Sequence, residues 1–190
     1  KIIFFSTPFD IESVNFLEKL KVKLYKIASF DISNYQLLKR IILTKKPTIV
    51  STGMAKLIEI KKNYRLFKKS NVELAILHCI SSYPNEDETS YLSNIHFLKK
   101  NFNCTIGFSD HTNDIKTSIY SALLGAKIIE KHFMISKKNN CVDKPVSIDP
   151  FQFKKMRIEI DKLTKIISKP KFGIRPEEKK ALVFKRNKIL

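Results

Sequence analysis

Short apolar runs alternate with longer stretches of helical spacing along this chain. Six times a run of three or four mainly apolar residues ends at a polar cluster and is followed by helical spacing. The runs are Ile2–Phe5, Leu24–Ile27, Thr48–Val50, Leu74–Leu77, Cys104–Ile106 and Lys127–Ile129. Apolar runs without polar alternation are typical of strands buried on both faces, as in a parallel sheet covered by helices. The pattern therefore predicts the α/β class.

Capping residues mark the starts of several predicted helices. Asp10 and Asn34 each precede helical spacing, where their side chains can accept a backbone N–H. Asp149 precedes Pro150, which suits the first helical position because its missing amide would have no partner there. The predicted helices cover residues 11–17, 35–42, 57–67, 91–98, 115–124 and a last segment from Pro150.

Six strand–helix units leave two architectures open. A (β/α)8 TIM barrel needs roughly 250 residues, and this chain has 190. One interpretation is an open six-stranded sheet, and the other is a barrel that lacks two units. Lys1 lies directly against a buried-strand pattern, so we expect an N-terminal part of a larger protein to be absent. Residues 169–190 lack helical periodicity and contain Pro170, Gly173 and Pro176, which indicates a linker.

Composition narrows the class of protein. No apolar run approaches the roughly 20 residues that cross a membrane, and 43% hydrophobic residues suffice for one core. We therefore expect a soluble, cytoplasmic protein without membrane partners. Cys79, Cys104 and Cys141 are odd in number and widely spaced. This spacing argues against a disulfide framework and a structural zinc site.

The net charge of +18 raises the question of nucleic-acid binding. Only five of the 36 basic residues are arginine, the residue that most often reads base edges. The lysines are spread over nearly every predicted helix, which indicates solvated helix faces. We expect no nucleic-acid partner, although the charge would help to attract anionic substrates.

The polar clusters that end the apolar runs carry the candidate chemistry. Because the carboxyl ends of parallel strands meet at one edge, these clusters should gather where a β/α barrel keeps its active site. The clusters are Ser6-Thr7-Pro8, Lys26-Ile27-Ala28-Ser29, Ser51-Thr52-Gly53-Met54, His78-Cys79-Ile80-Ser81, Ser109-Asp110-His111-Thr112 and Glu130-Lys131-His132.

Two histidines lie at neighbouring strand ends. Ser109 and His111 have the same parity, as do Glu130 and His132, so each pair can point to one side of the sheet. His111 and His132 are therefore candidate ligands of a divalent metal, although such pairs are as often structural. A core role is favoured for His78, which lies in a buried strand.

Hydroxyls and one lysine at successive strand ends suggest an oxyanion site. Hydroxyls donate hydrogen bonds to phosphate oxygens, and lysine supplies a compact positive charge. The alternative is that each serine ends its strand by bonding local backbone. The candidates are Lys26, Ser29, Ser51, Ser81 and Ser109.

Several short sequence motifs of this chain together resemble those of the sialic acid synthase family, which includes N-acetylneuraminate, pseudaminic acid and legionaminic acid synthases. The resemblance runs from about Ile3 to Ile160. The motifs are Ser6-Thr7-Pro8-Phe9-Asp10, Tyr25-Lys26-Ile27-Ala28-Ser29, Lys46-Pro47, Ser51-Thr52-Gly53-Met54, Ser82-Tyr83-Pro84, Gly107-Phe108-Ser109-Asp110-His111-Thr112, Leu124-Gly125-Ala126 and Glu130-Lys131-His132-Phe133.

The resemblance implies a (β/α)8 TIM barrel of which this chain holds units three to eight. Residues 1–168 would be a partial catalytic domain, and 169–190 a linker towards a C-terminal antifreeze-like domain. It also implies a homodimer when the protein is full length. The family's catalytic glutamate, a second lysine and a partner's arginine have no counterpart here. We therefore expect this chain alone to be inactive and poorly stable.

The resemblance also implies a reaction. Family members condense phosphoenolpyruvate with an N-acyl amino hexose of the mannose or 6-deoxy-altrose type. Carbon three of the enol attacks the open-chain aldehyde, water adds at carbon two, and phosphate is expelled from the tetrahedral intermediate. The product is a nine-carbon 2-keto acid.

By matching position, the catalytic residues would be Lys26, His111 and His132. The two histidines would hold a divalent metal, expected to be Mn²⁺, with Mg²⁺ or Co²⁺ as alternatives. Phosphoenolpyruvate would be bound by Lys26, Ser29, Ser51, Ser81 and Ser109. The sugar would face Asp31, Tyr83 and Asp143.

Some positions depart from the sialic acid pattern. Phe30 stands where many members have glycine, and Val142-Asp143 replaces Pro-Asp, which favours the pseudaminic acid branch over the N-acetylneuraminate and legionaminic acid branches. Phe30 would pack against a deoxy carbon of the sugar, or it is an ordinary buried aromatic. Two other functions stay open: a phosphoenolpyruvate aldol synthase acting on a shorter phosphosugar, and an inactive remnant or basic binding module.

Overall fold

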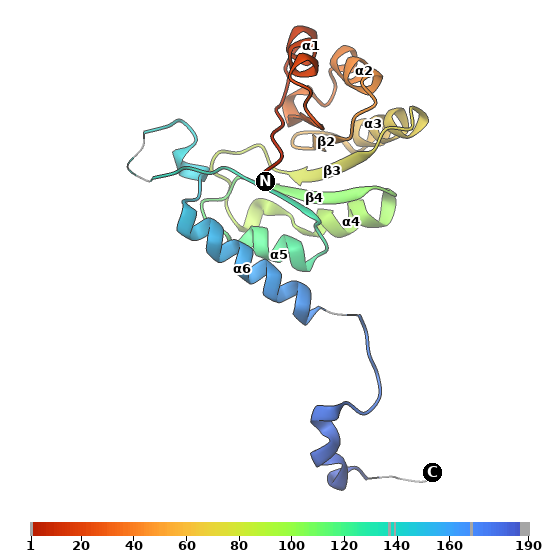
Figure 1. Cartoon of the computed structure of the whole chain (residues 1–190), viewed down its shortest axis with the longest axis vertical. Helices are drawn as coiled ribbons and strands as arrows, with labels where there is room; N and C mark the ends of the chain where they lie inside the picture. The colour runs from red at the N-terminus through yellow and green to blue at the C-terminus, as the bar shows by residue number, and fades with distance from the viewer. Residues whose placement is uncertain (1, 137, 139, 168, 187–190) are drawn as a thin grey trace.

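Five parallel strands form one sheet in the computed structural model, which describes residues 2–136, 138, 140–167 and 169–186. The strand order is β1-β2-β3-β4-β5, so each strand pairs with the next one along the chain. The α/β class is confirmed, and the arrangement is a half-barrel (Figure 1). The strands are β1 (Tyr25–Ile27), β2 (Thr48–Ser51), β3 (Leu74–Cys79), β4 (Thr105–Asp110) and β5 (Ile128–Lys131).

The first predicted strand is wrong. Residues 2–5 have no strand partner, and only Ser6 forms an isolated parallel bridge, with Tyr25 at the outer side of β1. The apolar side chains of this run are largely exposed; Phe4, for example, is 70% exposed. The open six-stranded sheet is therefore not what the described residues form. An apolar run becomes a strand only where a neighbouring strand supplies hydrogen bonds.

The predicted helices are all present. Asp10, Asn34 and Asp149 each accept a hydrogen bond from a backbone N–H in the first turn of the helix that they cap, as predicted. The fourth helix begins later than expected because Tyr91 adopts a positive φ of 44°. The helices are α1 (Ile11–Lys19), α2 (Tyr35–Leu43), α3 (Leu57–Lys69), α4 (Ser93–Asn101), α5 (Lys116–Leu123) and α6 (Pro150–Ile166). Short 3-10 helices are η1 (Ser29–Asp31), η2 (Glu88–Ser90), η3 (Lys144–Val146) and η4 (Pro176–Phe184).

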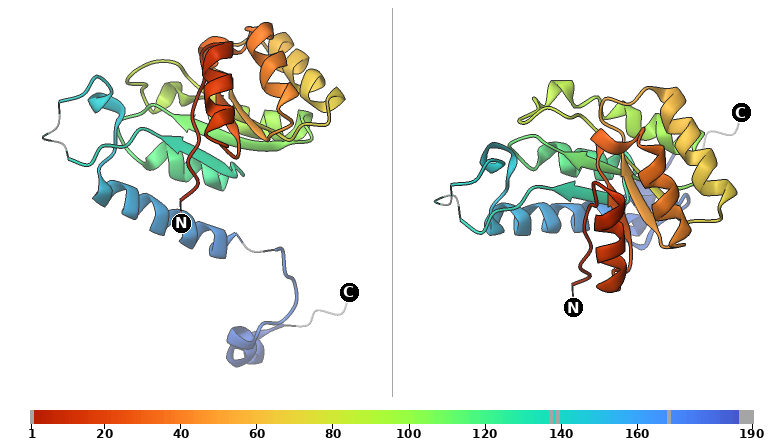
Figure 2. Two further views of the ribbon diagram at one scale, coloured as in Figure 1. Left: turned by 45° about the horizontal axis from the view of Figure 1, so that its top comes forward. Right: turned by 90° about the horizontal axis from the view of Figure 1, so that it is seen from above.

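The core lies between the outer face of the sheet and the helices that cover it (Figure 2). Alternate strand residues such as Ile27, Val50 and Ile76 point outward and are nearly fully buried against residues of the helices, including Leu38 and Phe67. Since strand side chains alternate between faces, the intervening residues point to the inner side of the half-barrel. That inner side is where the polar clusters lie.

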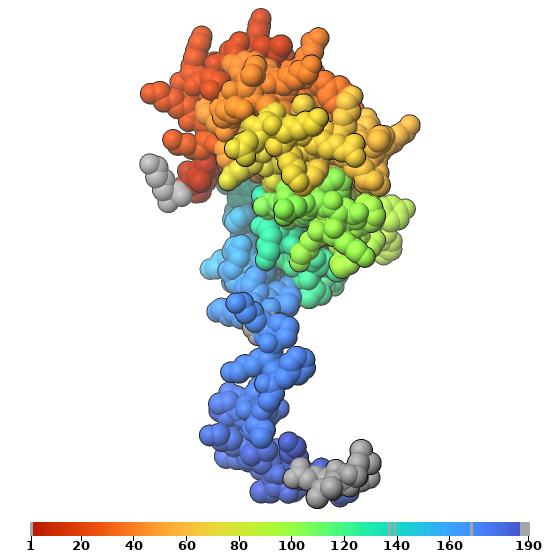
Figure 3. Space-filling view, turned by 90° about the vertical axis from the view of Figure 1, so that its right-hand side faces the viewer, coloured from red at the N-terminus to blue at the C-terminus, as the bar shows by residue number. Residues whose placement is uncertain are grey.

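The segment after α6 leaves the body of the molecule (Figure 1 and Figure 3). Its described residues, 169–186, are all exposed and include η4. Residues 1, 137, 139, 168 and 187–190 of the predicted domain and linker lie outside the described residues.

Two expectations from composition can be compared with the structure. In the described part of the chain, no helix has both the length and the apolar character to span a bilayer. Cys79, Cys104 and Cys141 are all free in the structure.

Candidate active site

The candidate site lies at the carboxyl ends of the strands, on the inner side of the half-barrel. Ser51, Cys79, Ser109 and Glu130 end or nearly end β2 to β5, and the last three are aligned partners in the strand register. Aligned residues of parallel strands point to the same face. Side chains from separate units therefore meet at one edge of the sheet.

Lys26 and Ser109 meet at the carboxylate of Glu130. The Nζ atom of Lys26 lies 3.1 Å from Oε1 of Glu130, and the hydroxyl of Ser109 donates to the same oxygen at 2.7 Å. Lys26 is only 7% exposed. Lys26 keeps further N–H donors for an anion, whereas Ser109 would have to turn its single proton away from Glu130 to join it.

Glu130 was not among the residues predicted to form the site. The sequence contained a signal for it, because Glu130 has the same parity as His132 and ends the strand next to that of Ser109. Its contact with Lys26 joins β5 to β1, two strands that do not neighbour each other in the sheet. Curvature of the sheet brings them together, and a linear pattern does not reveal it.

Three serine hydroxyls gather around Gly53 and the end of β2. The backbone N–H of Gly53 donates to Oγ of Ser29 at 2.9 Å. A Cβ atom on Gly53 would lie 2.2 Å from Oγ of Ser81 and 2.9 Å from Oγ of Ser29, so only glycine fits there. Among the described residues, the hydroxyl oxygens of Ser51 and Ser81 are buried and have no hydrogen-bond partner in the chain.

Buried hydroxyls without a partner cost free energy, about 1–3 kcal/mol each. A bound oxyanion would remove this cost by accepting hydrogen bonds from the two hydroxyls. The alternative that each serine bonds local backbone therefore does not hold for Ser51 and Ser81.

His111 and His132 lie side by side, with ring centroids 5.4 Å apart. Nδ1 of His111 lies 2.7 Å from the carbonyl oxygen of Ile80, which can only accept, so this nitrogen carries the proton. Nδ1 of His132 faces the carboxylate of Asp143 at 3.3 Å in the same way. Both rings therefore keep Nε2 as the nitrogen with a free lone pair.

The electrostatic environment keeps both imidazoles neutral. Burial lowers the pKa of His111 below its ordinary value, although the hydrogen bond to Ile80 works against this. Burial also lowers the pKa of His132, against the opposing charge of Asp143. Metal ligation requires neutral imidazole, usually with the second nitrogen held by a carbonyl or carboxylate.

The histidine pair therefore fits a divalent cation. Within the described residues there is no group of three or more histidine, cysteine or acidic side chains that would hold a metal. These two imidazoles would thus supply only part of a coordination sphere.

Tyr83 and Asp143 complete the cluster around the histidines. The ring of Tyr83 packs against that of His111 in a tilted arrangement, with centroids 4.0 Å apart, and meets that of His132 edge-on at 5.7 Å. Burial, with smaller contributions from Cys79, Asp143 and Glu130, raises the pKa of Tyr83 to about 12. Its hydroxyl therefore stays protonated and can donate a hydrogen bond.

Two other residues on the predicted sugar side lie in η1. The carboxylate of Asp31 accepts a hydrogen bond from the side chain of Asn34, 3.1 Å away, which ties it to the start of α2. Phe30 is 68% exposed, so the interpretation as an ordinary buried aromatic is wrong. An exposed aromatic beside Ser29 is free to contact a ligand.

His78 is a core residue, as favoured from the sequence. Its Nε2 atom is 2.7 Å from the carbonyl oxygen of Ser90, and its ring stacks on Phe108. Burial lowers its pKa, so it stays neutral.

Comparison with known proteins gives consistent matches. A family model described as the NeuB family matches residues 1–171. A pseudaminic acid synthase of Campylobacter jejuni is 41% identical over 156 residues, covering 82% of this chain and 46% of that protein. An N,N'-diacetyllegionaminic acid synthase of the same species is 38% identical over 167 residues, covering 86% of this chain and 50% of that protein. The chain spans about half the length of these curated relatives.

A solved structure shares the fold closely. The crystal structure of an N-acetylneuraminic acid (sialic acid) synthetase from Leptospira borgpetersenii, in complex with citrate, superposes with a TM-score of 0.91 at 34% sequence identity. The match covers 96% of this chain and 64% of that one. The parallel half-barrel is therefore similar to part of a sialic acid synthetase.

Proposed function

This chain belongs to the NeuB family of sialic acid synthases, and from that premise we propose that it is units three to eight of a (β/α)8 TIM barrel. In this proposal, Ile2–Phe5 would become the third barrel strand only when a preceding unit supplies hydrogen-bond partners, which the described residues do not. Residues 1–168 would form the partial catalytic domain, and residues 169–190 would be a linker towards a C-terminal antifreeze-like domain. The exposed path of residues 169–186 away from the half-barrel supports this division. The complete protein would be a cytoplasmic homodimer.

The proposed reaction joins phosphoenolpyruvate to an N-acyl amino hexose and releases phosphate, giving a nine-carbon 2-keto acid. A single observation carries this proposal. A lysine and serine cradle with two unpartnered hydroxyls lies at the same strand edge as two neutral, preoriented imidazoles. An anion site would hold the phosphate of the enol, and a metal held by the two histidines would orient the aldehyde beside it, as the condensation requires.

Lys26, Ser29, Ser51, Ser81 and Ser109 would bind the phosphate group of phosphoenolpyruvate. Carbon three of the enol forms the new bond to the sugar's aldehyde carbon, and water adds at carbon two. One proton of this water balances the proton taken up by the former aldehyde oxygen. The carbon two to phosphate oxygen bond then breaks, the departing phosphate takes the electron pair, and the carbon-two hydroxyl loses its remaining proton to become the keto group. The cradle stabilises this charge because its donors are already in place.

Nε2 of His111 and Nε2 of His132 would hold a divalent cation, for which we favour Mn²⁺ over Mg²⁺ or Co²⁺. When bound, such a cation acts as a Lewis acid that polarises the sugar aldehyde. Asp143 and the carbonyl of Ile80 keep the two rings oriented. Tyr83 and Asp143 lie against the rings, and with Asp31 they would accept or donate hydrogen bonds to the sugar.

Among the possible sugars, we favour a 6-deoxy-altrose type, which would make the complete protein a pseudaminic acid synthase. Supporting this choice are the exposed Phe30 beside Ser29 and the 41% identity to a pseudaminic acid synthase. The 38% identity to a legionaminic acid synthase keeps that branch, with N-acetylneuraminate, as the next candidates.

Phosphate release tests the proposal. The complete protein, stripped of metal, is incubated with phosphoenolpyruvate and each candidate amino sugar, with and without added Mn²⁺. We expect Mn²⁺-dependent release with one amino sugar, and a loss of at least about 100-fold in His111→Ala and His132→Ala, because Lewis-acid polarisation contributes several kcal/mol.

His96→Ala is the matched control, because His96 is exposed on α4 and should not affect turnover. Release that persists in His111→Ala and His132→Ala would contradict the proposed roles. Release with a shorter phosphosugar instead of an amino sugar would favour the other class of aldol synthase. No release with any sugar would favour an inactive remnant.

A further inference from the structure

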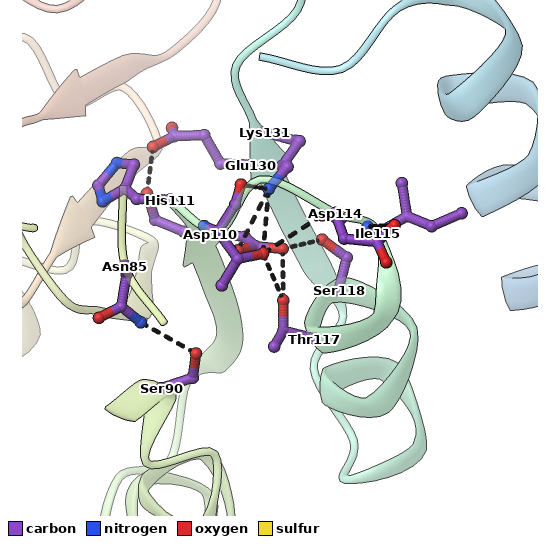
Figure 4. A network of polar contacts seen from close by, with 12 residues as sticks. Asn85, Ser90, Asp110, His111, Asp114, Ile115, Thr117, Ser118, Glu130 and Lys131 are labelled. Atoms are coloured by element: carbon purple, nitrogen blue, oxygen red, sulfur yellow. Dashed lines mark hydrogen bonds and ion pairs between the residues drawn. The ribbon is translucent and has the colours of Figure 1, made fainter. Parts of the chain in front are cut away.

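Asp110 and Lys131 form a buried ion pair (Figure 4). By strand alternation their side chains point to the face opposite that of Ser109 and Glu130. Asp110 precedes His111 at the end of β4, and Lys131 precedes His132 at the end of β5. Nζ of Lys131 is 3.3 Å from Oδ1 of Asp110, and the two side chains are 2% and 0% exposed. Neither the phosphate cradle nor the histidine cluster uses this pair.

The carboxylate of Asp110 is fully occupied by donors. Oδ1 accepts from the backbone N–H of Thr112 at 2.8 Å as well as from Lys131. Oδ2 accepts from the hydroxyls of Thr117 and Ser118, at 2.9 and 2.5 Å, at the start of α5. Four donors fill the lone-pair sites of a carboxylate, so Asp110 has no capacity left to bind a substrate.

Lys131 holds the chain on both sides of His111. Besides its ion pair with Asp110, Nζ donates to the carbonyl oxygen of Thr112 and lies 3.4 Å from its hydroxyl. One lysine, itself next to His132, thus contacts the residue before His111 and the residue after it. These contacts join the two histidine-bearing segments through a single side chain.

The strand pairing ends at this point. Asp110 and Lys131 are the last aligned pair of β4 and β5. The carbonyl oxygen of His111 accepts from the N–H of Asn85, and that of His132 accepts from the N–H of Ile148, so the two segments turn to different partners. Beyond the last strand pair, the Lys131 side chain therefore links the two segments on one face, and the ring contacts among His111, His132 and Tyr83 link them on the other.

Stability alone is a poor explanation for such a pair. Desolvation of two buried charges largely cancels their attraction, and replacing both with neutral side chains is often nearly neutral. A pair that contributes little net stability can still define one geometry. Here the geometry in question is the separation of the two imidazoles, whose ring centroids are 5.4 Å apart.

We propose that Asp110 and Lys131 are positioning residues that set the spacing of His111 and His132, and thereby the affinity of the site for a divalent cation. This inference rests on the proposed metal site. The two side chains act through the backbone of the neighbouring histidines and touch neither substrate nor metal.

The test measures Mn²⁺ affinity of the complete protein without substrate, by electron paramagnetic resonance of free Mn²⁺. The double variant Asp110→Asn/Lys131→Met removes both charges and keeps similar volume. We expect it to fold with a lower melting temperature, because the Thr112 carbonyl loses its donor. We expect it to bind Mn²⁺ about 10- to 100-fold more weakly, the range found for residues that orient metal ligands.

A second variant covers the case in which the double variant does not fold. Lys131→Gln keeps a donor for the Thr112 carbonyl and loses the charge, so we expect a folded protein with a smaller loss, of at least about threefold. Unchanged Mn²⁺ affinity in a folded double variant, or in Lys131→Gln if the double variant fails to fold, overturns the inference.

Glu18→Gln/Lys46→Met is the matched control. It removes another ion pair, at 2.5 Å, between α1 and the amino end of β2. This control should lower thermal stability and leave Mn²⁺ affinity unchanged. If the wild-type protein binds no Mn²⁺, the proposed metal site itself fails and this inference fails with it. If instead the wild type and the variants bind Mn²⁺ equally well, the metal site stands and only the positioning role of Asp110 and Lys131 is overturned.

Discussion

At the scale of single residues, Ser51 and Ser81 show that groups suited to binding a ligand can lower the stability of the free protein. Their hydroxyl oxygens are buried without a partner in the described chain. A ligand that accepts these hydrogen bonds would relieve the cost. The same residues should therefore behave in opposite ways in stability and in binding measurements.

We predict that Ser51→Ala leaves the melting temperature of the complete protein unchanged or raises it, because an unsatisfied polar group is removed. The affinity for phosphoenolpyruvate should fall about 10- to 100-fold, since hydrogen bonds to charged groups contribute about 1.5–3 kcal/mol. Differential scanning calorimetry and titration calorimetry measure the two quantities.

Ser121→Ala is the control for this prediction. Ser121 is fully buried in α5, but its hydroxyl donates to the carbonyl oxygen of Ser118 at 2.7 Å. We expect its loss to lower stability by about 1 kcal/mol and to leave phosphoenolpyruvate binding intact. A Ser51→Ala protein that binds phosphoenolpyruvate as tightly as wild type would remove Ser51 from the cradle.

At the scale of secondary-structure elements, Glu18 ties α1 to the amino end of the sheet. Its carboxylate accepts from the hydroxyl of buried Tyr25 in β1 at 2.6 Å and from Lys46 at 2.5 Å. Burial raises the pKa of Glu18, but the hydrogen bonds from Lys46 and Tyr25 outweigh it and hold this pKa below its ordinary value. The charged form is therefore the one that stabilises the fold.

The pH dependence follows from this direction. Because the folded pKa of Glu18 is below its unfolded value near 4.5, its contribution is present above that value and is lost as the pH falls through the folded pKa. We predict that Glu18→Gln lowers the free energy of unfolding by about 1–2 kcal/mol at pH 7. Urea titrations at a series of pH values measure this difference.

The difference between wild type and Glu18→Gln should shrink below about pH 4. Glu12→Gln, a change in an exposed carboxylate of the same helix, serves as the control and should have a smaller effect. A constant difference between pH 7 and pH 3 would mean that the charge of Glu18 is not responsible.

At the scale of the whole molecule, both outer sides of the sheet carry exposed apolar side chains. Beyond β1, Ile3 and Phe4 are 62% and 70% exposed, and after β5, Phe133 is 51% exposed. Open strand edges with apolar neighbours favour association with other chains. The proposed barrel units would cover these edges.

We predict that the 190-residue chain expressed alone is poorly soluble and inactive, and that the complete protein is soluble and releases phosphate from phosphoenolpyruvate. Soluble yield, size-exclusion chromatography and phosphate release compare the two proteins. The polar substitutions Phe4→Ser and Phe133→Ser in the short chain should raise its soluble yield without restoring activity. A soluble, active short chain would refute the proposal that further barrel units are needed.

Local patterns in the sequence were sufficient for much of the fold. The strand–helix alternation, the caps Asp10, Asn34 and Asp149, and the strand edge at which polar residues gather all depend on periodicity and hydrogen bonds within a few residues. Parity grouped His111 with Ser109 and His132 with Glu130. The strand register, which aligns Ser109 with Glu130, brings the two rings together.

Contacts between distant segments required the folded chain. Ile2–Phe5 reads as a strand but has no strand neighbour, whereas Glu130 meets Lys26 because curvature brings β5 towards β1. The pairing of Lys131 with Asp110 depends on the register between β4 and β5, whose aligned residues lie 21 residues apart in the sequence. Hydrophobic periodicity specifies which face a residue occupies, but only the packing of one unit against another specifies which residue it meets there.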